Sequence, residues 1–394
     1  MRIALFTDTY LPTHDGVGHM VSDLARSFTK RGHNVTIFTV ALPGCPLEES
    51  ESGARVLRAR SIPLPYYGQY RTAVMPWIKV TGAVEDGGFD VSHLHTPAMM
   101  GFTGLLAARH WDVPAIGTFH TNVKEMQKSL PRTRSLRMFF RLFWFWGAGV
   151  YARCNVVTAP SSAAKAVLLS SFRRDKQSPV EVVPNGIDVE RFHPGITTPD
   201  WPSRLDSNGK PIITFLGRLT LDKGIHTFLD AIAQLPEGSC RAVVAGDGLE
   251  KEKVVARLSS EPALGRAVRY IGHVSEEEKP ALLSQSQLWV MPSTADTSSI
   301  SAMEAMSSGA VCIASKIGGP AEMIRNGETG FLVDPHDPRA IARTISHALS
   351  DAESLSEMSR NARECAMDTF SIEKMADHYL ELYEREIRAH SRET

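Results

Sequence analysis

Short apolar runs alternate with amphipathic stretches along the chain. The run RIALF is followed by a polar loop, an amphipathic stretch and the β-branched segment NVTIFT. Helical spacing places the apolar residues of the amphipathic stretch on one face, namely Met20 or Val21, Leu24, Ala25 and Phe28. Apolar strands joined by amphipathic helices are typical of a parallel sheet covered on both faces. The pattern therefore predicts an α/β fold that opens with a strand, a helix and a strand.

The same alternation continues, with one break near the middle of the chain. Further strands are predicted in ARVLRARSI, FDVSHL and VPAIGTF, and later in PIITFL, QLWVM and AVCIA. From about residue 189 to 210 the composition turns to Pro, Thr, Asp, Ser and Gly, which predicts a linker and surface loop. A chain of 394 residues suits two domains of ordinary size. We place them at residues 1–190 and 211–370, followed by a final helical pattern in 371–394.

The segment PSTADTSSISAMEAMSSGAVCIAS predicts a loop, a short helix and a strand that carry candidate chemistry. Ser298 or Ser299 can cap the helix, and the free backbone N–H groups at its start suit a phosphate. Asp296 lies on the loop, and Glu304 follows eight residues later among Ala and Met side chains. Two interpretations stay open: a ligand site built on both acids, or a solvated aspartate and a satisfied buried glutamate.

A second loop offers the charges that a diphosphate needs. Arg218 and Lys223 follow the apolar strand PIITFL. Arg, Lys and helix N-termini can neutralise the charge that grows on a departing diphosphate. Glycine turns at residues 16–18 and 246–248 can bring the backbone close to a ligand, although such turns are common in Rossmann-like folds.

Polar clusters end two strands of the first half. The carboxyl ends of parallel strands gather ligands, so we expect these side chains to line one edge of a crevice: His93, His95, Thr96, His120, Thr121 and Asn122. A histidine at a strand end is more often a hydrogen-bonded structural residue than a ligand contact. His95 is accordingly expected to be structural or to face an acceptor.

The net charge of −1 conceals an asymmetry between the halves. Residues 1–180 hold 21 Lys or Arg and 12 Asp or Glu, against 22 and 32 in the remainder. Within an acid-free interval from residue 126 to 174, RSLRMFFRLFWFWG predicts a helix with an apolar face and a basic face. The apolar face holds Leu136, Phe139, Leu142, Phe143 and Trp146, and the basic face holds Arg134, Arg137 and Arg141.

Such a helix suits an anionic membrane surface, because its aromatic side chains can enter the headgroup region while its arginines meet lipid phosphates. The alternative is an internal helix whose aromatic face packs on its own domain. No nucleic-acid-binding motif accompanies the basic half, so a nucleic acid is not an expected partner.

Composition adds two expectations. No run of eighteen apolar residues occurs, and the chain begins with a strand pattern where a signal peptide would have an apolar core. A cytoplasmic location follows, peripheral on the inner face of the membrane if the basic helix binds lipid. The five scattered cysteines predict buried reduced thiols, with neither a disulfide framework nor a zinc site.

These motifs resemble those of retaining glycosyltransferases with the GT-B fold. The likeness rests on the acid, seven residues, acid signature from Asp296 to Glu304, on the PNGID turn at residues 184–188, on TFHT, and on the Arg and Lys loop. The family holds phosphatidylinositol mannosyltransferases, diacylglycerol glucosyltransferases and sucrose synthases. Its usual signature opens with Glu and then Gly-Phe-Gly. Here Asp296 precedes Thr-Ser-Ser, which shortens the acid by one methylene and fills the place of a glycine.

The resemblance implies a role for each matching position. Asp296 would hold hydroxyls of the donor sugar, Glu304 the ribose of the nucleotide, and Arg218 with Lys223 the diphosphate. His120 would lie beside the donor sugar, at the reaction centre. The remaining implied donor-binding residues are Gly16, Val17, Gly18, Gly217, Gly246, Gly248, His273, Val274, Ser298, Ser299 and Ile300.

The implied architecture is two Rossmann-like domains facing across a cleft, with the last helix crossing back to the first domain. The implied reaction moves a hexose, mannose or glucose, from a UDP- or GDP-sugar to a hydroxyl acceptor without a metal or other cofactor. A membrane lipid or glycolipid is the leading acceptor class, and a soluble sugar or sugar phosphate is the second. Two other hypotheses stay open: a sugar-nucleotide epimerase, and a catalytically weak sugar-nucleotide-binding subunit suggested by the departures at Asp296 and Ser299.

Overall fold

The computed structural model divides the chain into two compact units. The first unit is Met1–Gly186 with Ile372–Thr394, and the second is Ile187–Ser371. The structure describes residues 1–13, 16–64, 67–81, 88–120, 134–172, 178–197 and 201–393. The chain thus passes from one unit to the other inside the PNGID turn.

The predicted linker is wrong for the described part of residues 189–210, which packs into the second unit. A short helix, α7 (Trp201–Leu205), lies in this segment. Phe192, Trp201 and Leu205 are buried in the core of the second unit. The Ser307 hydroxyl also donates to the Phe192 carbonyl at 2.5 Å. Loop-forming residues dominate the composition of this segment, so its pattern gave no indication that three of its apolar side chains are core residues.

The first unit is built on a sheet that has eight strands within the described residues, in the order β10-β9-β8-β7-β1-β2-β4-β3. Neighbouring strands run parallel except β3, which is antiparallel to β4. The bounds are β1 Arg2–Phe6, β2 Asn34–Val40, β3 Glu48–Glu51, β4 Ala54–Ala59, β7 Val91–Leu94, β8 Ala115–Thr118, β9 Val156–Ala159 and β10 Val180–Val182. A separate hairpin pairs β5 (Ser61–Leu64) with β6 (Tyr67–Ala73).

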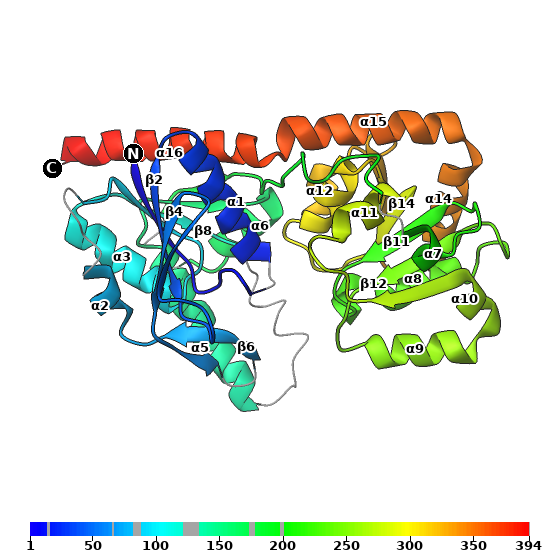
Figure 1. Cartoon of the computed structure of the whole chain (residues 1–394), viewed down its shortest axis with the longest axis horizontal. Helices are drawn as coiled ribbons and strands as arrows, with labels where there is room; N and C mark the ends of the chain where they lie inside the picture. Colours follow the sequence, from blue (N-terminus) through cyan, green and yellow to red (C-terminus); the bar gives the residue numbers. More distant parts are fainter. Residues whose placement is uncertain are drawn as a thin grey trace. The chain divides into compact units, whose positions relative to one another are not determined.

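The helices of the first unit include one that comes from the far end of the chain. They are α1 Gly16–Lys30, α2 Pro76–Thr81, α3 Met99–Trp111, α5 Arg134–Tyr151, α6 Ser162–Leu169 and α16 Ile372–Glu393. The predicted apolar face of α1 is confirmed, since all of its members are buried. Helix α16 lies beside α1 and shares its core through Met375, Tyr379 and Tyr383 (Figure 1). The predicted return of the last helix to the first domain is therefore confirmed.

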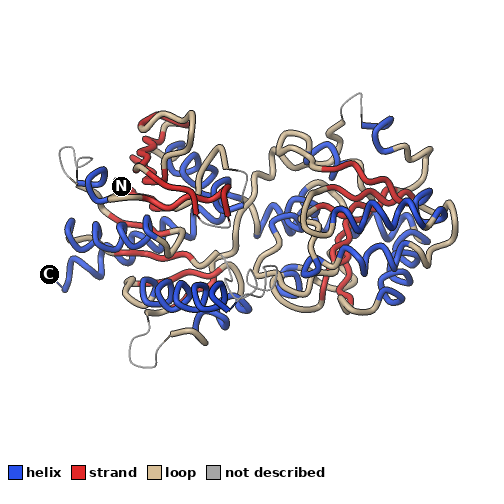
Figure 2. Tube along the Cα trace, turned by 90° about the horizontal axis from the view of Figure 1, so that it is seen from below, coloured by secondary structure: helices blue, strands red, loops and turns tan. Residues whose placement is uncertain are grey.

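The second unit has six parallel strands within the described residues, in the order β13-β12-β11-β14-β15-β16. In each unit strands and helices lie side by side in layers (Figure 2). The strands are β11 Ile212–Leu216, β12 Arg241–Ala245, β13 Val268–Gly272, β14 Leu288–Met291, β15 Val311–Ser315 and β16 Gly330–Val333. The helices after α7 are η2 Leu221–Lys223, α8 Ile225–Ile232, α9 Lys251–Ser260, α10 Pro262–Ala267, α11 Lys279–Ser284, α12 Ile300–Ser307, α13 Pro320–Met323, α14 Pro338–Ser350 and α15 Ala352–Thr369.

The strand order of each sheet reverses at one place. In the first sheet β1 lies between β2 and β7, and in the second β11 lies between β12 and β14. Open parallel sheets bind ligands outside the carboxyl ends of the strands at such a switch point. We therefore expect ligand-binding residues in the loops after β1 and β7 and in those after β11 and β14.

Among the described residues, no helix is both long and apolar enough to cross a membrane. All five cysteines are free thiols. Cys154, Cys240 and Cys312 are buried as predicted, whereas Cys45 and Cys365 are only half-buried.

Candidate active site

The loops after β11 and β14 bring two predicted site residues into contact. Lys223 ends η2 on the first loop, and its Nζ lies 2.9 Å from Asp296 Oδ2 on the second. Both side chains are largely buried, with 16% and 10% of their surfaces exposed. The Thr294 N–H donates to the Asp222 carbonyl at 2.8 Å and ties the two loops together. The switch point thus holds an ion pair that is shielded from most of the solvent.

Glycines allow three loops to approach one another at this pair. Gly224 has φ +74°, and a Cβ there would lie 2.1 Å from the Pro292 carbonyl oxygen. Gly318, in the loop after β15, has φ +72°, and its Cβ would lie 2.5 Å from the Asp296 carbonyl oxygen. The Gly319 N–H donates to that same oxygen at 2.8 Å. A side chain at either of the first two glycines would be strained and would push the Asp296 loop away.

Arg218 has a different environment from Lys223. Its side chain is 64% exposed, and its Nη2 lies 3.8 Å from Asp222 Oδ2. The structure therefore pairs Lys223 with Asp296 and leaves the Arg218 guanidinium largely in solvent, at the start of the same loop. One cation is held inside the loop and one is presented at its surface.

Glu304 is buried in α12, as its apolar neighbours indicated. It is 6% exposed, and Lys279 of α11 places its Nζ 3.9 Å from Glu304 Oε1. Burial raises the pKa of Glu304, and the nearby Lys279 ammonium opposes that rise. Lys279 also contacts Glu276 at 2.5 Å, so one cation serves two carboxylates. The partner that a buried acid requires is Lys279.

Of the two serines predicted to cap α12, Ser299 does not do so with its side chain. Ser299 occupies the N-cap position, but its side chain makes no capping hydrogen bond. Its hydroxyl is buried and has no partner among the described residues. Ser298 and Ile300 flank it, and Ile300 is the first residue of the helix. The start of α12 therefore has a buried hydroxyl that no described residue satisfies.

The Gly246-Asp247-Gly248 turn after β12 packs against the β11 loop. Gly246 has φ +139°, and a Cβ there would lie 1.9 Å from the Gly217 carbonyl oxygen. The Leu219 N–H donates to the Asp247 carbonyl at 2.8 Å. This turn therefore shapes the loop that carries both cations.

The two predicted donor contacts after β13 differ from each other. His273 is exposed, whereas Val274 is 3% exposed and belongs to the core of the second unit. The donor-binding role that the resemblance implies for His273 and Val274 stays a prediction. A β-branched residue directly after a strand packed inward, as an apolar residue near a sheet usually does.

In the first unit, two histidines meet at the ends of β7 and β8. His95 Nδ1 lies 3.2 Å from His120 Nε2, and the two rings stack at 5.5 Å between centroids. Burial lowers the pKa of His120 to about 3 and that of His95 well below its ordinary value, so both rings are neutral at pH 7. His95 Nε2 is buried without a partner in the described structure. Thr121 and Asn122 lie outside the described residues.

Asp8 is a site residue that the sequence analysis missed. It follows β1 at the switch point, where its Oδ2 accepts from the Thr96 hydroxyl at 2.6 Å and its Oδ1 from the Met100 N–H at 3.0 Å. Burial raises its pKa to about 6 against these hydrogen bonds. The signal was available in the sequence, because an acid two residues after RIALF ends an apolar strand with a charge.

Gly16, Val17 and Gly18 form the first turn of α1, so the predicted separate glycine turn is wrong. A Cβ on Gly18 would lie 3.2 Å from the Tyr10 Cα, which shows a close approach of helix and loop. Small residues here let α1 begin against the segment after β1.

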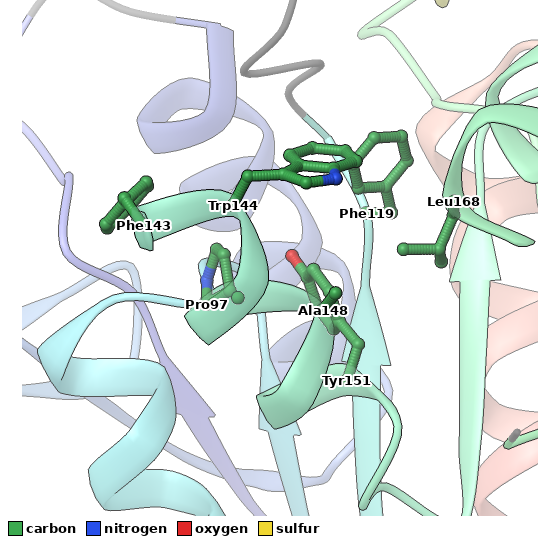
Figure 3. A pocket seen from close by; sticks show the side chains of 8 residues that line it. Pro97, Phe119, Phe143, Trp144, Ala148, Tyr151 and Leu168 are labelled. Atoms are coloured by element: carbon green, nitrogen blue, oxygen red, sulfur yellow. The ribbon is translucent and has the colours of Figure 1, made fainter. Parts of the chain in front are cut away.

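Helix α5 packs one side on the first unit and exposes the other. Figure 3 shows Trp144, Ala148 and Tyr151 directed toward a small apolar pocket. The pocket is lined by Pro97, Phe119, Phe143, Trp144, Gly147, Ala148, Tyr151 and Leu168. Met138, Arg141, Leu142, Phe145 and Trp146 are exposed instead. Leu142 is thus exposed although the half-buried Phe143 lines the pocket, contrary to the predicted shared apolar face. Trp146 is 45% exposed but still contacts the first unit, because its Nε1–H donates to the Pro97 carbonyl at 3.2 Å and its ring centroid lies 4.9 Å from that of Phe102.

The side chains of Arg134, Leu136, Arg137 and Phe139 lie outside the described part of α5. The predicted opposition of a basic face and an apolar face can therefore be followed only through the second half of the helix. There, Arg141 lies among exposed apolar residues.

Two family models together cover most of the chain. Residues 198–365 match the glycosyl transferases group 1 model, and residues 14–191 match glycosyltransferase family 4. The chain belongs to the group 1 family of glycosyltransferases with the GT-B fold, as its motifs suggested. It is an enzyme that transfers a sugar from a nucleotide sugar.

The relatives that it resembles use several substrates. A GDP-mannose-dependent alpha-mannosyltransferase of Mycolicibacterium smegmatis is 26% identical over 89% of this chain and 89% of that protein. A D-inositol 3-phosphate glycosyltransferase of Nocardioides is 29% identical over 96% of this chain and 86% of that protein.

Solved structures support the fold. Sucrose-phosphate synthase of Thermosynechococcus elongatus aligns with a TM-score of 0.80 and 22% identity, over 99% of this chain and 100% of its own. Anabaena HepE in complex with UDP aligns with a TM-score of 0.75 and 21% identity, over 98% and 100%. At such identities the likeness shows the architecture alone.

Proposed function

We propose that this glycosyltransferase is a retaining, metal-independent hexosyltransferase that uses a GDP- or UDP-sugar. The observation that carries the proposal is the Lys223–Asp296 ion pair at the switch point of the second sheet, 2.9 Å long and largely buried. A cation and a carboxylate held together there match the two needs of a sugar nucleotide, a charge for its diphosphate and an acceptor for its sugar hydroxyls. The second unit would bind the donor, and the first unit would bind the acceptor.

In the proposed reaction, Lys223 turns from Asp296 to the diphosphate when the donor binds. Asp296 then accepts hydrogen bonds from sugar hydroxyls, and the exposed Arg218 closes on the phosphates. The bond between the anomeric carbon and the phosphate oxygen breaks, and the acceptor oxygen bonds to that carbon on the same face. The acceptor proton passes to the departing diphosphate, whose charge the two cations neutralise.

Glu304 and Ser299 would complete the donor site. Glu304 would accept from the ribose hydroxyls, because its carboxyl is buried and only 3.9 Å from the Lys279 Nζ. The buried Ser299 hydroxyl, which has no partner among the described residues, and the backbone N–H groups at the start of α12 would donate to a phosphate.

The leading acceptor class is a membrane lipid or glycolipid. It is supported by the exposed apolar side chains of α5, among them Leu142 at 61% and Phe145 at 56% exposed, which lie next to Arg141. Exposed apolar residues beside a cation suit the boundary of an anionic bilayer. The second class, a soluble sugar or sugar phosphate, is favoured by the likeness to the D-inositol 3-phosphate glycosyltransferase.

A release assay tests the function. The chain is incubated with a panel of GDP- and UDP-sugars, with lipid extract or with soluble sugars as acceptors, and GDP or UDP is quantified. We expect release with one nucleotide and one acceptor class, and an α-linked product by NMR from an α-linked donor. A β-linked product would contradict retention. Failure of release with every donor, together with tight binding of one of them, would favour a sugar-nucleotide-binding subunit.

A further inference from the structure

A buried chain of polar side chains joins α16 to the ends of β7, β8 and β9. His93 is fully buried, and its two ring nitrogens lie 2.5 Å from the Tyr383 hydroxyl and 2.6 Å from the Thr118 hydroxyl. Thr118 Oγ1 is in turn 2.7 Å from Thr158 Oγ1, and the Tyr379 hydroxyl lies 3.0 Å from both. Helix α16 therefore reaches the strand ends through hydroxyl groups as well as apolar contacts.

The donors and acceptors available in this hydrogen-bond network determine the direction in which its protons are donated. Burial lowers the pKa of His93 well below its ordinary value, so the ring is neutral and has one N–H and one bare nitrogen. The network ends at a pure acceptor, the Gly117 carbonyl, 3.4 Å from Thr158 Oγ1. At its other end, the Tyr383 hydroxyl has His93 as its partner within the described structure.

If Thr118 donated to His93 and His93 donated to Tyr383, the Tyr383 hydroxyl proton would be buried without an acceptor among the described residues. The satisfied arrangement has Tyr383 donating to His93 Nδ1, and His93 Nε2–H donating to Thr118. Thr118 then donates to Thr158, which donates to the Gly117 carbonyl. The tautomer of His93 is thus set by a residue 290 positions away.

The ring of His93 also contacts the histidine pair of the candidate site. Its centroid lies 3.9 Å from that of His95, and His95 Nδ1 lies 3.2 Å from His120 Nε2. A ring that is hydrogen-bonded on both sides cannot rotate without breaking a buried bond. The His93 ring is therefore held in one orientation, and the His95 ring packs against it.

We propose that Tyr383 and His93 are positioning residues that hold the His95–His120 pair in its reactive orientation, so that one side chain of α16 acts on the candidate active site through His93. The link to catalysis rests on the proposed function and on the role that the family resemblance implies for His120, which would lie beside the transferred sugar. The contacts themselves belong to the first unit alone.

A purely structural role would not need this arrangement. The face of α16 that packs on the first unit is otherwise supplied by apolar residues, including Met375 and Leu382. A phenylalanine would pack as well as a tyrosine there and would spare the burial of a hydroxyl. The hydroxyls of Tyr383 and Tyr379 differ in one respect, because Tyr383 contacts an imidazole nitrogen while Tyr379 contacts only threonine hydroxyls.

That difference supplies a matched pair of variants, Tyr383→Phe and Tyr379→Phe, in the full-length chain. Imidazole ¹⁵N NMR reports the tautomers, and kcat and KM are measured with the sugar nucleotide that supports release. For Tyr383→Phe we expect altered signals from His93, His95 and His120, and a kcat about tenfold to a hundredfold lower at an unchanged donor KM. Tyr379→Phe should keep the wild-type signals and kcat.

Equal losses of kcat in both variants, or wild-type signals and kcat in Tyr383→Phe, would overturn the proposal. If Tyr383→Phe does not fold, Thr118→Val removes the other partner of His93, and Thr118→Ser should restore both the signals and kcat. If the wild type releases no nucleotide, the proposed function fails, and the ¹⁵N signals of His95 and His120 still decide the positioning claim.

Discussion

The largely buried ion pair makes Lys223→Ala a test of stability and catalysis together. Removing one partner of a fully buried pair costs about 3–5 kcal/mol, while an exposed pair contributes about 0–1 kcal/mol. Lys223 and Asp296 are 16% and 10% exposed, so we expect Lys223→Ala to lower the free energy of unfolding of the second unit by about 2–4 kcal/mol. The loss arises because Asp296 stays buried without its cation.

Two further variants isolate the cause. Lys253 forms a similar contact, 3.0 Å to Glu250 Oε1, but its side chain is 68% exposed, so Lys253→Ala should cost under about 1 kcal/mol. Adding Asp296→Ala to Lys223→Ala removes the unpaired charge, and the double variant should lose less than the two single losses combined, by about 1–3 kcal/mol.

The measurement is urea unfolding of the full chain, with hydrogen exchange of the β11 and β14 amides to assign the loss to the second unit. Equal losses of unfolding free energy in Lys223→Ala and Lys253→Ala would refute the reasoning.

Turnover tests the proposed role of the same loop in catalysis. Both Arg218→Ala and Lys223→Ala should lower kcat by about two to three orders of magnitude, because each removes a charge from the leaving group. Arg218→Ala should do so with a change in stability of under about 0.5 kcal/mol, since its side chain is 64% exposed.

Three other outcomes are expected. Burial raises the folded-state pKa of Asp8 to about 6, so the contribution of the Asp8 carboxyl to stability is present below about pH 4 and is lost as pH rises through 6. Relative to Asp8→Asn, the wild type should lose up to about 3 kcal/mol of unfolding free energy between pH 4 and 8 in urea titrations. Parallel plots of unfolding free energy against pH for the two proteins would contradict this. Gly318→Ala should lower the free energy of unfolding by at least about 1 kcal/mol more than Gly327→Ala. Both glycines have φ near +80°, but only a Cβ on Gly318 would collide with a backbone oxygen and displace a loop. Equal unfolding midpoints of the two variants would show that the loop moves without strain. Nucleotide release should persist in excess EDTA, since protein cations neutralise the diphosphate in the proposed reaction, and a loss that Mg²⁺ restores would argue for a metal-dependent site.

Local pattern predicted much of the second unit because its chemistry lies on short loops. Arg218, Lys223 and Asp296 each lie within seven residues of the end of an apolar strand, and parallel strands end at one edge of a sheet. Their common location could therefore be inferred without knowing the fold in detail. The 2.9 Å contact between Lys223 and Asp296 could not, because it depends on the glycine-mediated approach of three loops.

The first unit was harder to predict because its polar contacts join distant parts of the chain. Tyr383 lies on a helix whose apolar spacing is ordinary, and nothing near it in sequence indicates a histidine partner. The packing of residues 189–210 into the second unit was missed for a related reason: Trp201 becomes a core residue only when the rest of the second unit covers it. Tertiary contacts, which composition does not encode, decided both cases.

Helix α5 shows how an amphipathic pattern can be assigned to the wrong side. Spacing grouped Leu142 with Phe143, yet Leu142 is 61% exposed while Phe143 lines the apolar pocket. The outward face of the second half of α5 is therefore apolar around Arg141, a composition suited to a bilayer surface. If that face meets lipid, the chain should sediment with anionic vesicles at low salt. Part of the binding should fade at 1 M salt, where the Debye length is about 3 Å.

Variants of α5 separate the surface from the core. Leu142→Ser with Phe145→Ser should abolish vesicle binding with a change in stability of under about 1 kcal/mol, because both side chains are already in solvent. Phe143→Ser should instead destabilise the first unit, since it removes an aromatic wall of the pocket. A wild type that ignores vesicles at every salt concentration would remove the main support for a lipid acceptor. The soluble sugar or sugar phosphate would then become the first acceptor to test.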